Sequence, residues 1–414
     1  SRVADESVRR VVPLADGNTV AVLPSAGLFG ANASGKTNLL RALNDLRTLV
    51  LQSFRLGSTA SGVPRRPFLL EEGLKRAPSS FQVEMVLDGV RWLYGVEIDD
   101  ECVLEEYATH YPKGRPAVVF DRRRDEVKYG AVLKRYQAAF GPLLRPNALL
   151  LSVAGAAAEN PLSPLFEWFT RNLLLADTKT REARRSVTAH LLDEPEHRSR
   201  VLGLLKAADL GISGMERVTP DPEFVERLSR AVRVLSGSTD FDSEITESER
   251  VAVEDGLRMI HDGPEGPIAF DDDDESLGTR VWSGLIGPII QVLDGGHVLL
   301  ADELDASLHP YLVRSLIKLF QRPDTNPKGA QLIFNAHDVS VLGDSAPEQI
   351  LGRDQIWFTE KEAGGATTLT PLTDFRVRKD EALERRYLQG RFGGVPVLSD
   401  AEFEAALEHR AVPS

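Results

Sequence analysis

The chain has 414 residues and a formal net charge of −13, from 49 Lys and Arg against 62 Asp and Glu. This acidic balance argues against a protein that binds nucleic-acid backbones in general, because such binding needs a basic face. The apolar runs are far shorter than the ~20 residues that span a bilayer, so we expect no membrane contact. The single cysteine, Cys102, excludes an internal disulfide and a thiolate zinc site, and the cytoplasm is the expected location.

The first 160 residues predict a strand, a glycine loop and a helix, followed by an antiparallel lobe. A short apolar strand ends just before Gly30, and the apolar spacing of residues 35–46 predicts an amphipathic helix. Two runs of alternating apolar residues in 81–98 flank Asp88-Gly89, which is a strong signal for a β-hairpin. Further short strands are expected at residues 118–120 and 127–129.

The pattern becomes helical from residue 161 to about residue 265, which predicts an inserted helical region. From residue 266 to residue 414, helices and strands alternate, as in a parallel sheet. The expected elements there are a helix at 279–293, a strand at 297–301, a helix at 310–320 and a strand at 331–336. The fold class predicted is therefore α/β, with a mixed or parallel sheet, an antiparallel β lobe and the helical insert.

Charged clusters are expected to lie on the solvated surface, because runs of like charge usually do. The basic ones are Arg65-Arg66, Arg122-Arg123-Arg124 and residues 181–185, and the acidic one is residues 271–274.

A phosphate-binding loop is the clearest chemical signal, because residues 30–37 fit the pattern G-x-x-x-x-G-K-[ST] between a strand and a helix. The glycines allow backbone N–H groups to surround phosphate oxygens at the positive end of the helix. Lys36 is predicted to reach the β- and γ-phosphates of ATP, and the Thr37 hydroxyl to coordinate Mg²⁺. The residues expected to bind ATP here are Gly30, Ala31, Asn32, Ala33, Ser34, Gly35, Lys36 and Thr37.

A second signal is the apolar strand at 297–301, which ends in two carboxylates. Asp302 is placed to hold Mg²⁺ and Glu303 to polarise the attacking water. A strand that simply ends in acidic surface residues is the alternative, and the glycine loop elsewhere in the chain makes that alternative less favourable.

Three further segments resemble those of ABC-type ATPases. Asp305, in Leu304-Asp305-Ala306-Ser307-Leu308-His309-Pro310, occupies the position of the D-loop, and His337, in residues 331–338, that of the switch histidine. Ser276 and Gly278, in Glu275-Ser276-Leu277-Gly278-Thr279-Arg280, occupy the position of the signature, in a form similar to that of RecF-like and overcoming-lysogenisation-defect ATPases. The resemblance implies an ATPase head formed by residues 1–160 and 266–414, with residues 161–265 inserted.

The resemblance also implies a homodimer that shares two ATP molecules. Ser276, Gly278 and Asp305 would then join the ATP site across the dimer seam, while Lys36, Glu303 and His337 would be catalytic. The alternative for Ser276 is that it caps the helix that begins near Thr279.

The C-terminal part is similar to AAA-family ATPases of the abortive-infection (RloA/AbiL-like) type. The residues that carry this similarity are 353–361, 372–375 and 387–396. Members of that family are bacterial phage-defence components, which implies a nucleotide-driven sensor that controls a separate effector. The expected effector is a nuclease, and it would be a separate protein, because residues 338–414 lack the acidic pattern of the nuclease domain that follows the ATPase in related proteins.

Other functions remain as alternatives. A RecF- or SMC-like DNA-repair ATPase would clamp DNA directly, and a basic concave face in the dimer would favour it. A scaffold that holds ATP without hydrolysis commonly lacks the carboxylate that Glu303 supplies. The ATPase subunit of a transporter is disfavoured, because its signature differs and its domain needs fewer residues between Lys36 and Asp302.

Overall fold

The computed structural model describes residues 9–55, 62–219, 221–223, 225–227, 255–343, 350–377, 382–395, 399, 402 and 404. Within these ranges, no helix has the length and apolar character that a membrane span requires.

A six-stranded sheet forms the centre of the fold. In spatial order its strands are β16 (Thr367–Pro371), β15 (Ile356–Lys361), β3 (Ser25–Phe29), β14 (Gln331–Asn335), β13 (Val298–Ala301) and β9 (Leu173–Ala176). Every neighbouring pair is parallel except β15 and β16. Because β3, β13 and β14 run in the same direction, the residues that follow them meet at one edge of the sheet.

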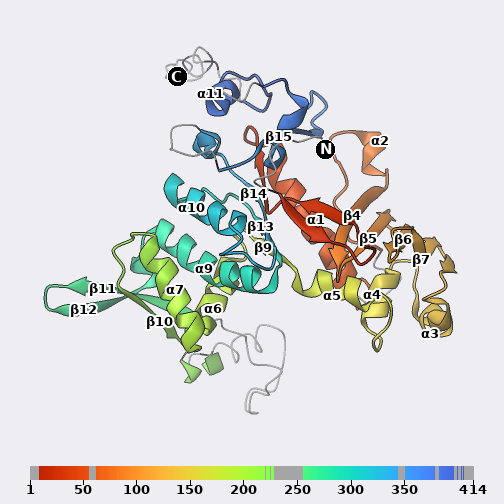
Figure 1. Cartoon of the computed structure of the whole chain (residues 1–414), viewed down its shortest axis with the longest axis horizontal. Helices are drawn as coiled ribbons and strands as arrows, with labels where there is room; N and C mark the ends of the chain where they lie inside the picture. Colours follow the sequence, from red (N-terminus) through yellow and green to blue (C-terminus); the bar gives the residue numbers. More distant parts are fainter. Residues whose placement is uncertain are drawn as a thin grey trace, which may run out of the picture.

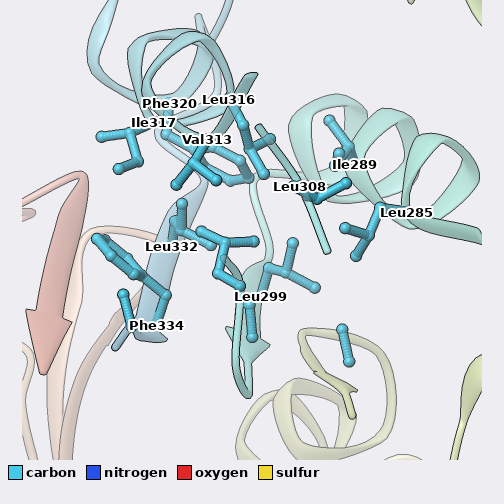
Figure 2. Packing of buried hydrophobic residues seen from close by; sticks show 14 of the residues in the cluster. Leu285, Ile289, Leu299, Leu308, Val313, Leu316, Ile317, Phe320, Leu332 and Phe334 are labelled. Atoms are coloured by element: carbon cyan, nitrogen blue, oxygen red, sulfur yellow. The ribbon is translucent and has the colours of Figure 1, made fainter. Parts of the chain in front are cut away.

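Helices cover the sheet and bury its apolar side chains. The principal ones are α1 (Lys36–Gln52), α9 (Leu277–Gly295) and α10 (Pro310–Gln321). Figure 2 shows one face of this packing, where strand residues meet residues of α10 and α9. From the strands come Leu299, Leu332 and Phe334, from α10 come Val313, Leu316, Ile317 and Phe320, and from α9 come Leu285 and Ile289. This core fixes the strand ends that carry the site.

An antiparallel lobe follows α1, as the sequence predicts. Its strands are β4 (Ser79–Leu87), β5 (Val90–Ile98), β6 (Val103–Tyr111), β7 (Ala117–Arg123) and β8 (Glu126–Tyr129), with α2 (Glu72–Lys75) before them. Asp88 and Gly89 both have positive φ values, of 50° and 74°, and turn β4 into β5. The helices α3 (Gln137–Phe140), α4 (Leu150–Gly155) and α5 (Ser163–Arg171) complete a second apolar core with this lobe.

Residues 161–265 contain strands as well as the helices that the sequence predicts. The helices after α5 are α6 (Arg181–Leu191) and α7 (Pro195–Ala207). The strand β9 belongs to the central sheet, and β10 (Gly214–Val218), β11 (Gly256–Gly263) and β12 (Gly266–Asp271) form a separate antiparallel sheet. Most of residues 220–254 lies outside the described residues. The fold class itself is confirmed as α/β with a mixed sheet, an antiparallel lobe and inserted helices.

The ends of the described chain lie beside the central sheet. The strands β1 (Arg10–Pro13) and β2 (Thr19–Val22) form a hairpin, and α11 (Leu383–Leu388) follows β16. Figure 1 shows the lobe of β4–β7 on the right, α6, α7 and β10–β12 on the left, and α11 at the top. The C-terminal segment reaches the glycine loop, because Gly394 packs against Gly30.

The sequence predicts that the charged clusters lie on the solvated surface, and in each cluster the structure shows one residue for which this prediction is wrong. The side chain of Arg65 is 1% exposed and pairs with Asp100, and Arg122 is fully buried beside Glu106. Arg185, in residues 181–185, pairs with Asp272 of the acidic run, and burial raises the pKa of that carboxyl. These arginines hold the structure together, because desolvated charges are tolerated where they are paired.

Candidate functional site

The glycine loop joins β3 to α1 and has the backbone that a phosphate cradle needs. Gly35, immediately before α1, has φ of 102°, in a region that side-chain-bearing residues rarely adopt. Ser34 is buried and its hydroxyl lies 2.6 Å from that of Thr359 on β15. Asn32 and Ala33 are exposed at the tip of the loop. The loop is thus fixed to β15 through Ser34 and exposed to solvent at its tip.

Lys36 lies inside this loop. Its Nζ donates to the backbone oxygens of Gly30, at 2.5 Å, and Ala31, at 3.0 Å. Burial lowers the pKa of Lys36, while the carboxylates of Asp305, Glu303 and Asp302 act in the opposite direction. The ammonium is therefore held where phosphate oxygens would replace the two carbonyls as its partners.

The two halves of the site meet at Thr37 and Asp302. The Thr37 hydroxyl donates to Asp302 Oδ1 at 2.8 Å, and Asn335 Nδ2 donates to the same oxygen at 2.6 Å. A hydroxyl and a carboxylate are hard oxygen donors of the kind that Mg²⁺ prefers. The donor set of Thr37 and Asp302 therefore fits a magnesium ion next to the phosphate loop, and their role as its ligands stays a prediction.

Glu303 follows Asp302 in a strained conformation. Its φ is 55°, in the left-handed region that residues other than glycine seldom occupy, and its backbone N–H donates to Asn335 Oδ1. Its carboxylate is exposed and lies 4.0 Å from Nε2 of His337. Such strain often occurs at functional sites, because the surrounding contacts must hold it in place.

Asp305 differs from the expectation in what its side chain contacts. Its Oδ2 accepts the backbone N–H groups of His337, at 2.8 Å, and Asp338, at 2.6 Å. Within the subunit, this carboxylate therefore positions the loop that carries the switch histidine. Its contact across a dimer seam stays a prediction.

The signature segment begins α9. Ser276 is the N-cap residue of this helix, and its Oγ accepts the backbone N–H of Thr279 at 3.2 Å. A Cβ atom at Gly278 would lie 2.6 Å from the backbone oxygen of Ser307, so the signature packs closely against the D-loop. The capping role weighed for Ser276 is present, and its role in a second subunit stays a prediction.

A protein-family profile described as "AAA domain, putative AbiEii toxin, Type IV TA system" matches residues 25–343. The chain belongs to this AAA family. The match begins at β3 and extends past His337, so it includes the phosphate loop, the signature segment, the acidic strand end and the loop that carries His337. None of the curated proteins matches the chain significantly.

Solved structures with a similar course of the chain include heads of SMC proteins. An SMC head bound to the C-terminal winged-helix domain of ScpA is 11% identical, with a TM-score of 0.36, over 86% of this chain and 94% of that one. The SMC head domain from Thermotoga maritima is 13% identical, with a TM-score of 0.36, over 89% of this chain and 97% of that one. The likeness is distant.

The site also contains residues that the sequence analysis missed. Asn335 contacts Asp302 and Glu303 at once, and the Thr367 hydroxyl donates to the backbone oxygen of Ser34 at 2.9 Å. A Cβ atom at Gly394 would lie 3.2 Å from Cα of Gly30, so the C-terminal segment packs against the phosphate loop. The sequence signals available were a polar residue at a strand end and the glycines of the C-terminal motif.

Proposed function

We propose that this AAA domain binds Mg²⁺ and ATP and hydrolyses ATP. The observation that carries the proposal is the hydrogen bond between Thr37 and Asp302, residues 265 positions apart in the chain. It brings the phosphate loop and the acidic strand end into one site, with Lys36 and Glu303 on either side. That combination is what phosphoryl transfer to water requires.

The site residues would divide the reaction among them. A bound Mg²⁺ would neutralise charge on the phosphates, and Thr37 and Asp302 would hold it. Lys36 would bind the β- and γ-phosphates, and Glu303 would orient the attacking water and accept its proton. His337, near Glu303 and fixed by Asp305, would contact the γ-phosphate.

We further propose that the protein acts as a homodimer that controls a separate effector in bacterial phage defence. The description of the matched family refers to a type IV toxin–antitoxin system, which supports a role of this kind. The resemblance to abortive-infection ATPases of the RloA/AbiL type points in the same direction, and a nuclease is the effector that we expect. The nucleotide state would set whether the effector is active.

Direct clamping of DNA by a RecF- or SMC-like head has less support. Arg65, Arg122 and Arg185, one from each basic cluster, are paired inside the structure and cannot face a phosphate backbone. Tight DNA binding by the purified chain, with a steep dependence on salt, would favour the clamp instead.

Two variants test the ATPase proposal. Lys36→Ala should lower ATP affinity at least tenfold, because a charge-assisted hydrogen bond contributes about 1.5–3 kcal/mol. Glu303→Gln should keep ATP affinity and lower turnover by about 10²–10⁴, the usual contribution of a general base. ATP binding and phosphate release would be measured together, with Lys75→Ala, a change at an exposed ion pair of α2, as the control. If both variants hydrolyse ATP at the rate of the parent protein, the proposal that this site is an ATPase site is wrong.

A further inference from the structure

The hydroxyl of Thr188 joins α6 to α9, the helix that begins with the signature. Thr188 is fully buried on α6. Its Oγ1 donates to the backbone oxygen of Ser283 at 2.8 Å and accepts the backbone N–H of Gly287 at 3.0 Å. The other acceptor within reach, the backbone oxygen of Arg184 in its own helix, is further away, at 3.3 Å. Ser283 and Gly287 are four positions apart, the spacing at which an α-helix bonds a carbonyl directly to an amide.

This contact alters the hydrogen bonding of α9 next to a proline. Pro288 lies inside the helix and has no N–H to offer to the carbonyl of Gly284. At the preceding position of the same ladder, the carbonyl of Ser283 and the N–H of Gly287 both bond to Thr188. A proline and a side chain inserted into the ladder are two of the known causes of helix bends. We therefore expect the course of the N-terminal half of α9 to depend on the Thr188 hydroxyl.

The two helices are also fixed to each other by close packing and by charge. A Cβ atom at Gly287 would lie 2.7 Å from the backbone nitrogen and from Oγ1 of Thr188, so the helices approach closely there. The carboxylate of Asp272 joins them nearer the signature. Its Oδ2 lies 2.8 Å from Nη1 of Arg185 on α6 and 3.2 Å from Nε of Arg280 in the first turn of α9. A displacement of α6 would therefore displace the start of α9.

The segment before α6 reaches the acidic strand end. The strand β9 pairs with β13, and the backbone oxygen of Ala176, its last residue, accepts the N–H of Asp302 at 2.8 Å. Asp177 then fixes the turn into α6, because its Oδ1 accepts the N–H groups of Lys179, at 3.0 Å, and Thr180, at 2.9 Å. A short path of fixed contacts thus connects Asp302 to the signature through β9, α6 and α9.

We propose that Thr188 is a positioning residue for the signature, which it places through α9 over the γ-phosphate bound to a second copy of the chain. Ser276 lies seven positions before Ser283, about 10 Å along the helix axis, so a small change in the direction of α9 displaces it. The inference rests on the proposed function, because the signature acts only in a dimer that hydrolyses ATP. It gives α6, within the inserted residues 161–265, a part in the reaction.

Thr188→Val tests this bridge, because it removes the hydroxyl and nearly keeps the shape of the side chain. The variant should bind ATP as the parent protein does and lower kcat roughly ten- to a hundredfold, since displacement of a catalytic group by about 1 Å can cost that much. Thr188→Ser keeps the hydroxyl and should keep most of kcat. Thr170→Val, at an exposed position of α5, is the matched control and should change neither value. A kcat equal to that of the parent protein in Thr188→Val would overturn the inference.

A mixing experiment separates action on the signature from a structural role within one subunit. In a mixed dimer of one Thr188→Val subunit and one Lys36→Ala subunit, one of the two sites combines an intact phosphate loop with an intact signature. Activity above that of either variant alone is the expected result. No gain would show that the substitution disables its own subunit, and the inference would be wrong.

The proposed dimer has a separate test, so that its failure is distinguishable. Ser276→Arg blocks the signature directly, and its mixture with Lys36→Ala should also regain activity. If that mixture gains nothing, the shared site itself is wrong, and the role of Thr188 is wrong with it. If only the mixture with Thr188→Val gains nothing, the shared site stands and the role of Thr188 alone is wrong.

Discussion

Asn335 is the residue that connects the two carboxylates of the site. Its amide donates to Asp302 and accepts the backbone N–H of Glu303, and it is fully buried. This one side chain therefore orients the carboxylate of Asp302, the proposed metal ligand, and holds the strained backbone of Glu303, the proposed general base.

Replacement of Asn335 by Ala should lower turnover more than ATP affinity. The change removes one of the two donors to the Asp302 carboxylate and leaves the part-buried N–H of Glu303 without its partner, which costs about 1–3 kcal/mol. Steady-state hydrolysis and equilibrium ATP binding would be compared in the same variant. Gln331→Ala is the control, because Gln331 lies at the other end of β14 and bonds to Leu23. An equal loss of turnover in both variants would contradict a positioning role.

The contrast between Asn335 and Lys36 shows what a motif can predict at this scale. Lys36 and Thr37 are recognisable because the phosphate loop requires fixed spacing in one stretch of chain. An asparagine at the end of an apolar strand has no such local requirement. Its role follows from the parallel register of β13 and β14, which places it beside Asp302.

At the scale of elements, the C-terminal segment supports the phosphate loop. The Tyr387 hydroxyl of α11 donates to the buried backbone oxygen of Gly394 at 2.9 Å, and Gly394 packs on Gly30. The ring of Tyr387 stacks on that of Phe358 in β15, with centroids 5.5 Å apart. The same strand holds Ser34 through Thr359, so α11 and β15 act on one loop.

Tyr387→Phe tests this support, because it removes one hydroxyl and keeps the stacked ring. A neutral hydrogen bond contributes about 0.5–1.5 kcal/mol, so ATP affinity should fall by roughly two- to tenfold if the loop loosens. Tyr311→Phe, at an exposed position of α10, is the matched control. Calorimetric titration with ATP would measure both, and identical affinities would indicate that the segment does not act on the loop.

The sequence predicts some helices and strands more clearly than others. The β4–β5 hairpin is predictable, because Asp88-Gly89 supplies the positive φ values that its turn needs. The strand β9 is not, because Leu-Leu-Leu-Ala is too short for periodicity to distinguish a strand from a helix. Its pairing with β13 is a tertiary contact, which a local pattern cannot contain.

At the scale of the whole molecule, a buried charge cluster joins the antiparallel lobe to the helices. Glu106 is fully buried and accepts the backbone N–H groups of Leu150 and Leu151 at the start of α4, together with the Tyr94 hydroxyl. Arg122 lies 3.5 Å away. Burial raises the pKa of Glu106, while Arg122 and these hydrogen bonds act in the opposite direction.

Glu106→Gln should destabilise the lobe by about 3–5 kcal/mol, because it leaves a buried arginine without its counter-charge. Urea unfolding followed through tryptophan fluorescence, to which Trp92 on the neighbouring strand contributes, would measure the change. Glu105→Gln is the control on the same strand, since Glu105 pairs with an exposed arginine and such pairs contribute little. Similar midpoints for the two variants would show that the buried pair does not hold the lobe.

The last prediction concerns two copies of the chain. In a dimer of the ABC type, the signature of one subunit closes over the γ-phosphate held by the loop of the other. Lys36→Ala and Ser276→Arg should each be inactive alone, and a mixture should regain activity. Each mixed dimer has one site with both lesions and one with neither, so random mixing should restore about a quarter of the parent rate in a two-fold symmetric dimer.

The capping role of Ser276 gives the opposite result in this experiment. If Ser276 only stabilises the start of α9 within its own subunit, its replacement disables that subunit, and mixing restores nothing. Obligatory coupling of the two sites would also restore nothing. A mixed dimer of one Lys36→Ala subunit and one intact subunit separates these cases. If the two sites are obligatorily coupled, this dimer has no ATPase activity, whereas if each site lies within one subunit, it keeps half of the parent rate. Activity in this dimer, together with no activity in the mixture of Lys36→Ala and Ser276→Arg subunits, would exclude the shared site.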